Sequence, residues 1–199
     1  MKTFIKLLEN YEKDLEKRIT KKGVTVTVSG LSGVGKGTVA EALAKNLNLQ
    51  KVVMGDIFRK IAKERGIGLE KLSATREDEL DLLVEKTALE LAMTGNVVLD
   101  GRMTALSAGN NADCRILIEC MMEKKSDRVA KRENISIEEA AIRLKSRDAA
   151  DSAKYLRLYG LDVSERSFYD VVIETTNMDI ETTKNEAVKI VRQVLKDKL

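Results

Sequence analysis

The sequence contains no histidine, which removes a whole set of catalytic devices. Without histidine the chain has no serine-histidine triad, no histidine-ligated metal site and none of the usual acid-base groups of neutral pH. The two cysteines, Cys114 and Cys120, have neither metal-ligand nor redox spacing, so we expect two free thiols. Any catalysis by this chain therefore has to rely on charge and on the positioning of reactants.

Proline, low-complexity linkers and long hydrophobic runs are missing as well. No run of about 18 apolar residues occurs, so the sequence offers no candidate membrane span. The 35 basic and 32 acidic residues nearly cancel, and the net charge of +3 does not indicate a nucleic-acid partner. With 199 residues, 43% of them hydrophobic, we expect one soluble, cytoplasmic chain that acts on small molecules, as a monomer or else as a dimer through its amino-terminal residues.

Short apolar runs alternate with longer amphipathic segments, a pattern typical of βαβ organisation. The candidate strands are residues 24–29, 51–54, 96–100, 115–119 and 170–175, and candidate helices fill the intervals and residues 180–196. Five parallel strands with helices on both faces follow from this alternation. The sequence predicts a doubly wound α/β fold.

Residues 1–22 precede the alternation and are predicted to form one amphipathic helix. Their apolar residues recur at helical spacing among charged neighbours: Phe4, Leu7, Leu8, Tyr11, Leu15 and Ile19. Interspersed acidic residues argue against a transit peptide, which is acid-poor. We expect this helix to pack against the domain formed by residues 23–199, or against a second copy of the chain.

The stretch VTVTVSGLSGVGKGT, residues 24–38, nearly matches the phosphate-binding consensus G-x-x-x-x-G-K-[ST]. The residues before it alternate like a strand, and KGTVAEALAKNL after it has the apolar spacing of a helix. In that context glycines allow close backbone approach, successive N–H groups surround phosphates, and a lysine supplies positive charge. The residues expected to bind the phosphates of a nucleotide are Gly30, Ser32, Gly33, Val34, Gly35, Lys36, Gly37 and Thr38.

A dinucleotide-binding fingerprint is nested in the same stretch, because GKGTVA satisfies G-x-G-x-x-[GA] with Asp56 about 20 residues further on. That fingerprint places its first glycine directly after the strand, whereas Gly35 lies well beyond Ser29, and it has no role for a lysine. The phosphate loop is therefore the favoured interpretation.

GLSGVGKGT resembles the loop of nucleoside monophosphate kinases, the adenylate and cytidylate kinases, which carry a glycine after the lysine and then a threonine. MGDIFR, VVLDGR and DRVAKR resemble further segments of these enzymes, and D-G-R is the form found in cytidylate kinases. With NADCRILI and YDVVIETT, the order and spacing from Val24 onward are most similar to the short archaeal type of cytidylate kinase. The resemblance implies the P-loop sheet order 2-3-1-4-5, an acceptor-binding segment at about residues 55–95 and a lid at about 124–160.

A monophosphate acceptor suits this set of residues on chemical grounds. The second pKa of a phosphate monoester is about 6, so the acceptor oxygens are ionised near neutral pH and need no strong base. Bringing two polyanions into line is work for arginine, lysine and magnesium. A hydroxyl acceptor, such as a sugar or shikimate, would more often need a carboxylate base, so such acceptors are disfavoured but stay open.

Arg59 and Arg102 follow the second and third candidate strands, at the edge where open α/β sheets bind ligands. Arg59 could also be a solvated helix arginine, and Arg102 a plain surface residue, although the end of an apolar strand is an unusual place for one. By resemblance these two grip the acceptor phosphate, and a planar fork suits such a bidentate contact. The same motifs imply that Asp56, Asp100 and Gly101 also belong to the substrate-binding residues.

Asp100 ends the strand NVVLD and resembles the carboxylate that holds magnesium through water. Gly37 has no hydroxyl to offer the metal, so nucleotide phosphates, water and this carboxylate would hold it. Thr38 would then bond a phosphate oxygen. The cofactors implied are ATP and Mg²⁺.

The charged stretch from residue 123 to 159 carries arginines four residues apart, as exposed helices often do. SIEE at Ser136 is a capping box that predicts a new helix, after a turn near Asn134. The resemblance gives several residues here a role as lid groups: Arg128 against the adenine of ATP, Arg132 on its phosphates, and Arg147, Asp151 and Lys154 at the closed site. Bacterial relatives carry arginine in place of the lysine.

The acceptor base should lie near Asp81 and Glu85, which retain two acidic positions of the archaeal D-x-x-x-D-x-R-Q pattern. Thr87 and Ala88 replace its polar pair, and MTALSAG lacks the aromatic residue usual after D-G-R. The sequence predicts γ-phosphoryl transfer from ATP to a pyrimidine nucleoside monophosphate, with CMP (and dCMP) as first candidate. AMP, UMP, another small metabolite, or a binding protein that uses ATP as a switch are the alternatives.

Overall fold

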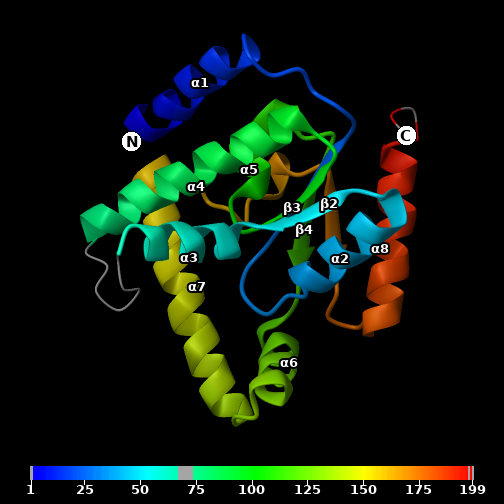
Figure 1. Ribbon diagram of the computed structural model, residues 1–199. Helices are drawn as coiled ribbons and strands as arrows, with labels where there is room; N and C mark the ends of the chain where they lie inside the picture. The colour runs from blue at the N-terminus through cyan, green and yellow to red at the C-terminus, as the bar shows by residue number, and fades with distance from the viewer. Residues whose placement is uncertain (1, 67–73, 197, 199) are drawn as a thin grey trace.

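The computed structural model describes residues 2–66, 74–196 and 198 of the chain (Figure 1). Its strands are β1 (Thr25–Ser29), β2 (Gln50–Val53), β3 (Val97–Asp100), β4 (Cys114–Glu119) and β5 (Val171–Glu174). Its α-helices are α1 (Lys2–Glu16), α2 (Lys36–Leu47), α3 (Met54–Glu64), α4 (Ala74–Thr94), α5 (Thr104–Ala108), α6 (Met122–Glu133), α7 (Ile137–Tyr159) and α8 (Ile180–Val194). Two short 3-10 turns are η2 (Gly109–Asn111) and η3 (Arg166–Phe168). Each strand lies within one residue of its predicted position at either end.

The strands form one parallel sheet in the order β2-β3-β1-β4-β5, which confirms the predicted topology. The central strand β1 is fully buried and pairs with β3 on one side and β4 on the other. Val28 lies opposite Asp100, so the glycine loop after β1 and the residues after β3 leave the sheet side by side. This is the switch point at which open α/β sheets bind ligands.

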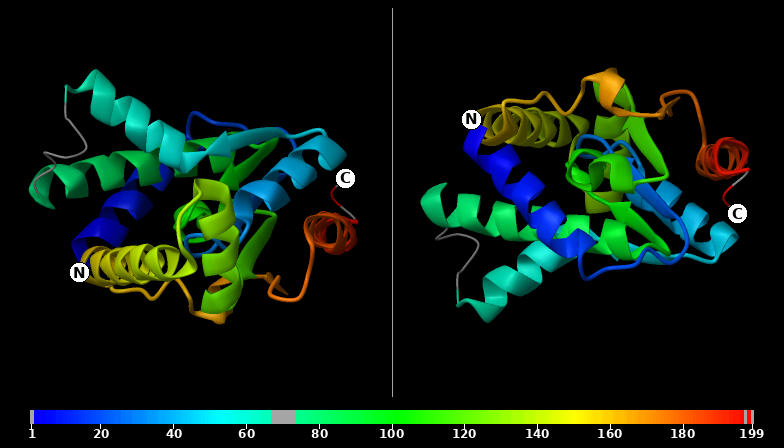
Figure 2. Two further views of the ribbon diagram at one scale, coloured as in Figure 1. Left: turned by 90° about the horizontal axis from the view of Figure 1, so that it is seen from below. Right: turned by 90° about the horizontal axis from the view of Figure 1, so that it is seen from above.

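Helices cover both faces of the sheet. α2 and α8 pack together over one face, where Val26, Val39 and Leu43 belong to the main hydrophobic cluster. α3 and α4 cover the β2-β3 side of the other face, around Leu99 and Val84. Figure 2 shows α2 and α8 on one side and α1, α3 and α4 on the other in both views.

Helix α1 packs against α4, with a further contact to α7. Leu15 is buried against Leu89 and Met93 of α4, and Tyr11 donates a hydrogen bond to Glu90. Leu8 reaches the cluster around Tyr155 on α7. Of the predicted apolar stripe, Leu7 is 40% exposed and Phe4 lies outside the described side chains. The amphipathic face thus packs within the chain itself.

Helices α6 and α7 form a hairpin that projects beyond the carboxyl edge of the sheet (Figure 1). Asn134 closes α6 with φ of 54°, a left-handed conformation that asparagine tolerates. Ser136 caps α7, because its hydroxyl accepts the N–H of Glu139 at 3.0 Å, so the predicted helix start is confirmed. The carboxylate of Glu139 accepts a hydrogen bond from Arg143, and the structure shows the first half of the capping box. The hairpin therefore has a fixed turn at its tip.

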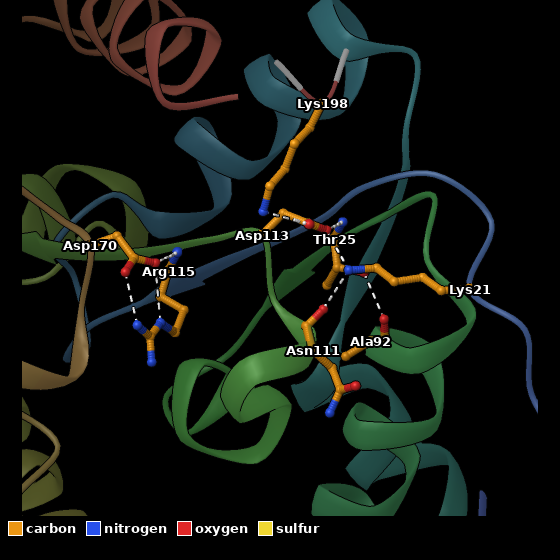
Figure 3. A network of polar contacts seen from close by, with 8 residues as sticks. All are labelled: Lys21, Thr25, Ala92, Asn111, Asp113, Arg115, Asp170 and Lys198. Carbon is orange, nitrogen blue, oxygen red and sulfur yellow. Dashed lines mark hydrogen bonds and ion pairs between the residues drawn. The ribbon is translucent and has the colours of Figure 1, made fainter. Parts of the chain in front are cut away.

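The opposite, amino edge of the sheet carries a network of charges around Asp113 (Figure 3). The carboxylate of Asp113 accepts the Thr25 N–H at 2.8 Å and the ammonium groups of Lys21 and Lys198. These contacts tie the segment after α1 and the carboxyl terminus to the start of β4. Among the described residues, no helix is both long and apolar enough to cross a membrane.

Candidate active site

Two large cavities at the carboxyl edge of the sheet share part of their lining. The first, here called the α4 cavity, has about 690 Å³ and lies between α3, α4, α7 and the residues after β3. The second, the α8 cavity, has about 1400 Å³ and lies between the glycine loop, α6 and residues 176–181. Both are lined by the same four residues, Gly33, Lys36, Asp100 and Arg132. The two cavities therefore meet at the glycine loop.

The glycine loop needs its glycines for different reasons. Gly30, Gly33 and Gly35 all have positive φ, which side chains disfavour. At Gly30 a β-carbon would lie 2.4 Å from the carbonyl oxygen of Ile118, so the loop entry packs directly on β4 and lines neither cavity. Val34, Gly35, Gly37 and Thr38 line the α8 cavity, and α2 begins at Lys36 with its amino end toward it.

Lys36 lies at the junction of the cavities. Its ammonium group donates a hydrogen bond to the Leu31 carbonyl at 2.6 Å. Although the residue as a whole is half-buried, burial of the ammonium group lowers the pKa of Lys36 to about 8, with Asp100 opposing that shift. A lysine held this way is a cation with few protein partners, available to an anionic ligand.

Asp100 is only 6% exposed and faces the same junction. Burial raises the pKa of its carboxyl group, and the positive charges of Lys36 and Lys51 work in the opposite direction. A β-carbon on Gly37 would lie 3.5 Å from one carboxylate oxygen of Asp100. Glycine at this position therefore leaves room beside the carboxylate.

Arg102 connects three parts of the site. Its guanidinium donates to the Ser32 hydroxyl at 2.6 Å and lies 3.0 Å from a carboxylate oxygen of Asp151 on α7. The side chains of Arg102 and Asp151 are 19% and 14% exposed. Gly101 and Arg102 both line the α4 cavity, next to the loop residue Ser32.

Arg59 and Asp56 lie one turn apart on α3 and form an exposed ion pair. Arg59 lines the α4 cavity, whereas Asp56 does not. Asp56 is thus connected to the site by its ion pair with Arg59. The sequence placed both residues at the site without this distinction.

The lid arginines fall into two groups. Arg132 and Arg147 line the α4 cavity from α6 and α7. Arg132 pairs with the adjacent Glu133, while Arg147 makes no hydrogen bond or ion pair with any residue that the structure describes. Both are exposed, so both are available to bind an anion in the cavity.

Arg128 is bound differently. Its guanidinium donates to the hydroxyl and carbonyl oxygens of Thr175, at 3.1 and 2.7 Å, and to the carbonyl of Met178 at 3.0 Å. It lines the α8 cavity while bracing the segment after β5. The sequence predicted that Arg128 lies beside a nucleotide, and it gave no indication of the hydrogen bonds to the segment after β5.

Asp81 and Glu85 lie on successive turns of α4, each 6% exposed, at the inner end of the α4 cavity. Lys154 lies 3.0 Å from Asp81, and the Ser107 hydroxyl donates to Glu85. Burial raises the pKa of Glu85 to about 7, against the effect of the Ser107 hydrogen bond. Both predicted acids are thus brought together in one polar end of the cavity.

Several lining residues were missed by the sequence. Phe58 on α3 and Tyr155 on α7 supply aromatic walls, although no aromatic follows D-G-R. Tyr155 lies one helical turn after Asp151, a spacing that could have indicated it. Ser107 lines neither cavity but bonds the lining residue Glu85, and it had no sequence signal because Glu85 comes from another helix.

The chain was compared with known proteins. Residues 25–177 match the Cytidylate kinase-like family. The chain is 39% identical to the cytidylate kinase of Pyrococcus horikoshii over 155 residues, 77% of this chain and 80% of that protein. It is 36% identical to the cytidylate kinase of Methanocaldococcus jannaschii over 165 residues, 80% of this chain and 93% of that protein. Helix α1 precedes the matched residues.

Solved structures share the fold at lower sequence identity. A shikimate kinase from Acinetobacter baumannii superposes with a TM-score of 0.60 at 18% identity, covering 94% of this chain and 99% of its own. An uncharacterised protein from Eubacterium ventriosum gives a TM-score of 0.66 at 17% identity, covering 84% of this chain and 98% of its own. The family match covers most of the chain and the sequence relatives agree with it, so the chain belongs to the cytidylate kinase-like family of P-loop kinases.

Proposed function

We propose that this nucleoside monophosphate kinase transfers the γ-phosphoryl group of ATP to CMP, and to dCMP, giving ADP and the diphosphate. The observation that carries the proposal is the pair of cavities that meet at Lys36, Asp100 and Arg132. With ATP in one cavity and a nucleoside monophosphate in the other, the γ-phosphoryl group and the acceptor phosphate would meet beside Lys36 and Arg132. In-line transfer requires that arrangement.

The α8 cavity is the proposed donor site. The N–H groups of residues 33–38 and the amino end of α2 would surround the phosphates of ATP. Arg128 and the segment at Met178 would lie beside the adenine. Thr38 would bond a phosphate oxygen.

The α4 cavity is the proposed acceptor site. Arg59 and Arg102 would grip the acceptor phosphate with their planar forks. At the inner end, Asp81 and Glu85 would accept a hydrogen bond from the exocyclic amine of cytosine. Phe58 and Tyr155 supply the apolar walls that a base needs.

Catalysis would need no general base, since the acceptor phosphate is already ionised. Lys36, Arg132 and Arg147 would neutralise the charge on the transferring group. We propose that α6 and α7, at about residues 124–160, act as a lid that brings both arginines in, and that residues 55–95 form the acceptor-binding segment. Residues 67–73 of that segment lie outside the described part of the chain.

Magnesium fits the residues that are present. Among the described residues no group of three acidic, histidine or cysteine side chains converges as a metal cage. Asp100 faces the junction, and Gly37 leaves space beside its carboxylate. Mg²⁺ keeps several waters and binds through one or two carboxylates plus phosphates, so Asp100 would hold it through water. The ion would neutralise the phosphate charge.

A monomer is the proposed assembly. Leu15 and its neighbours are buried against α4 of the same chain, so this apolar face is already covered. Size-exclusion chromatography with light scattering tests it. A stable dimer would contradict the proposal.

The acceptor is tested by assaying ATP and Mg²⁺ with CMP, dCMP, UMP and AMP side by side. A site that pairs the amine of cytosine penalises UMP, because Asp81 and Glu85 would lose that hydrogen bond; such discrimination reaches about 10⁴ to 10⁵ at best. CMP should have the highest kcat/KM. A better rate with AMP or UMP would overturn the cytidine assignment, and no turnover with any monophosphate would overturn the monophosphate acceptor. Shikimate and gluconate in the same assay test the small-metabolite alternative.

A further inference from the structure

The phosphate loop differs between its two halves. A β-carbon at Gly33 would lie 3.1 Å from Val129, 3.3 Å from Lys125 and 3.4 Å from Leu144, all on the α6–α7 hairpin. A β-carbon at Gly35 would meet nothing within 4 Å. The first half of the loop is therefore packed against the hairpin, while the second half is open to the α8 cavity.

A buried ion pair lies where the first half of the loop meets the hairpin. Lys125 of α6 is 3% exposed and Asp148 of α7 is 8% exposed, and the ammonium group bonds one carboxylate oxygen of Asp148. The other carboxylate oxygen accepts the backbone N–H of Ser32 at 3.2 Å. One carboxylate thus joins α6, α7 and the loop.

Ser32 is held from a second direction as well. Its hydroxyl accepts a hydrogen bond from Arg102, which lies 3.0 Å from Asp151. Asp148 and Asp151 are three residues apart on α7, so both lie on the same face of the helix. Ser32 is therefore linked to α7 through both its backbone and its side chain.

We infer that Asp148, held in place by Lys125, is a positioning residue that fixes the first half of the phosphate loop against the α6–α7 hairpin and thereby sets the affinity for ATP. The inference rests on the proposed use of this loop for the phosphates of ATP. The Asp148 carboxylate can accept the Ser32 N–H in one orientation of its side chain. Lys125 fixes that orientation because its ammonium group bonds the second carboxylate oxygen. Because Arg147 precedes Asp148, the same contact sets where that arginine stands relative to the loop.

Two double variants separate this role from stability. Lys125→Met/Asp148→Asn and Lys125→Met/Asp148→Leu both remove the buried ion pair, and neither leaves a buried charge unpaired. Only the asparagine variant keeps an oxygen that accepts the Ser32 N–H. Matched melting temperatures for the two would show that both retain the fold.

The measurement is the dissociation constant for ATP with Mg²⁺ and no acceptor, by titration calorimetry. We expect the leucine variant to bind ATP about fivefold to tenfold more weakly than the asparagine variant, and the asparagine variant to bind somewhat more weakly than the wild type, because Lys125 no longer orients its side-chain oxygen. Equal dissociation constants for the two variants would overturn the inference, whether or not their melting temperatures differ.

Failure of the proposed function has a different signature. A wild-type protein that binds no ATP would overturn the donor site and the inference together, whereas ATP binding without turnover on any monophosphate would overturn only the acceptor. If the leucine variant does not fold, Lys125→Met/Asp148→Ala replaces it with the same expectation, since alanine also lacks an acceptor.

Discussion

The two edges of the sheet both carry charge, but they use it differently. At the amino edge, Asp113 is met by two lysines and a backbone N–H, and Arg115 bonds Asp170 through two guanidinium nitrogens at 2.8 and 3.1 Å (Figure 3). At the carboxyl edge, Lys36 bonds only a loop carbonyl among the described residues, and Arg147 bonds none of them. The amino-edge charges named here are all paired within the protein. The carboxyl edge has paired charges as well, such as Arg102 and Asp151, but there Lys36 and Arg147 face the cavities.

The difference is also visible in the pKa values. Burial alone would raise the pKa of Asp113, but hydrogen bonds from Lys21, the Thr25 N–H and Lys198 together lower it. Burial raises the pKa of Asp100, and its neighbouring lysines do not reverse the shift. A carboxylate paired within the protein stabilises the fold, whereas one that is buried without such pairing is available to an external cation.

The largest expected effect is at the carboxyl edge. Lys36→Met should lower kcat by about 10² to 10³ or more, because a cation at the transferring phosphate is lost. The melting temperature should stay close to that of the wild type, since the ammonium group makes one hydrogen bond to the protein. Lys21→Met at the amino edge is the control, and it should keep wild-type kcat. Near-normal turnover of a folded Lys36→Met protein would remove the loop from the mechanism.

Deletion of residues 1–20 should act on stability. The deletion removes Leu15, which packs on α4, and exposes Leu89 and Met93. At the usual value for buried aliphatic side chains, the free energy of unfolding should fall by about 2–4 kcal/mol. We expect kcat to change less than twofold, since α1 lines neither cavity. Urea unfolding, light scattering and steady-state kinetics check it. A selective loss of kcat with unchanged unfolding and mass would contradict the prediction.

Arg102→Lys keeps the charge and removes the planar fork. We expect kcat/KM for the acceptor to fall about 10- to 100-fold, with a smaller change in KM for ATP. The matched control is Arg115→Lys, which removes the fork from a bidentate pair at the amino edge. That variant should lose some stability and no activity. Equal kinetic losses in both would erase the distinction between the edges.

Asp113→Asn should lower the free energy of unfolding by about 1–2 kcal/mol at pH 7, because it weakens the hydrogen bonds of a charged acceptor. The folded pKa of Asp113 is below its unfolded value of about 3.9, so the stabilisation is present above that pH and is lost as the pH falls through the folded value. The difference from wild type should therefore shrink as the pH falls below about 4. A gap that widens on acidification, or a change in kcat, would contradict this assignment.

Local patterns were enough to predict much of the fold. The strands and the loop depend on residue periodicity and on glycines next to one another in the chain, and the SIEE cap depends on residues three apart. Asp100 and Arg102 could be placed at the site because parallel strands end at the same edge. Asp56 shows the limit, since its motif is present but its side chain lies outside the cavity.

The sequence by itself determined the order of strands and helices, the phosphate loop and the family, because each depends on short-range spacing. Only the tertiary structure decided which charges are paired. The Ser32 N–H meets Asp148 across 116 positions of the chain, and Ser107 meets Glu85 from another helix. Such contacts depend on how helices pack on the sheet, and packing brings together residues whose separation no local period encodes.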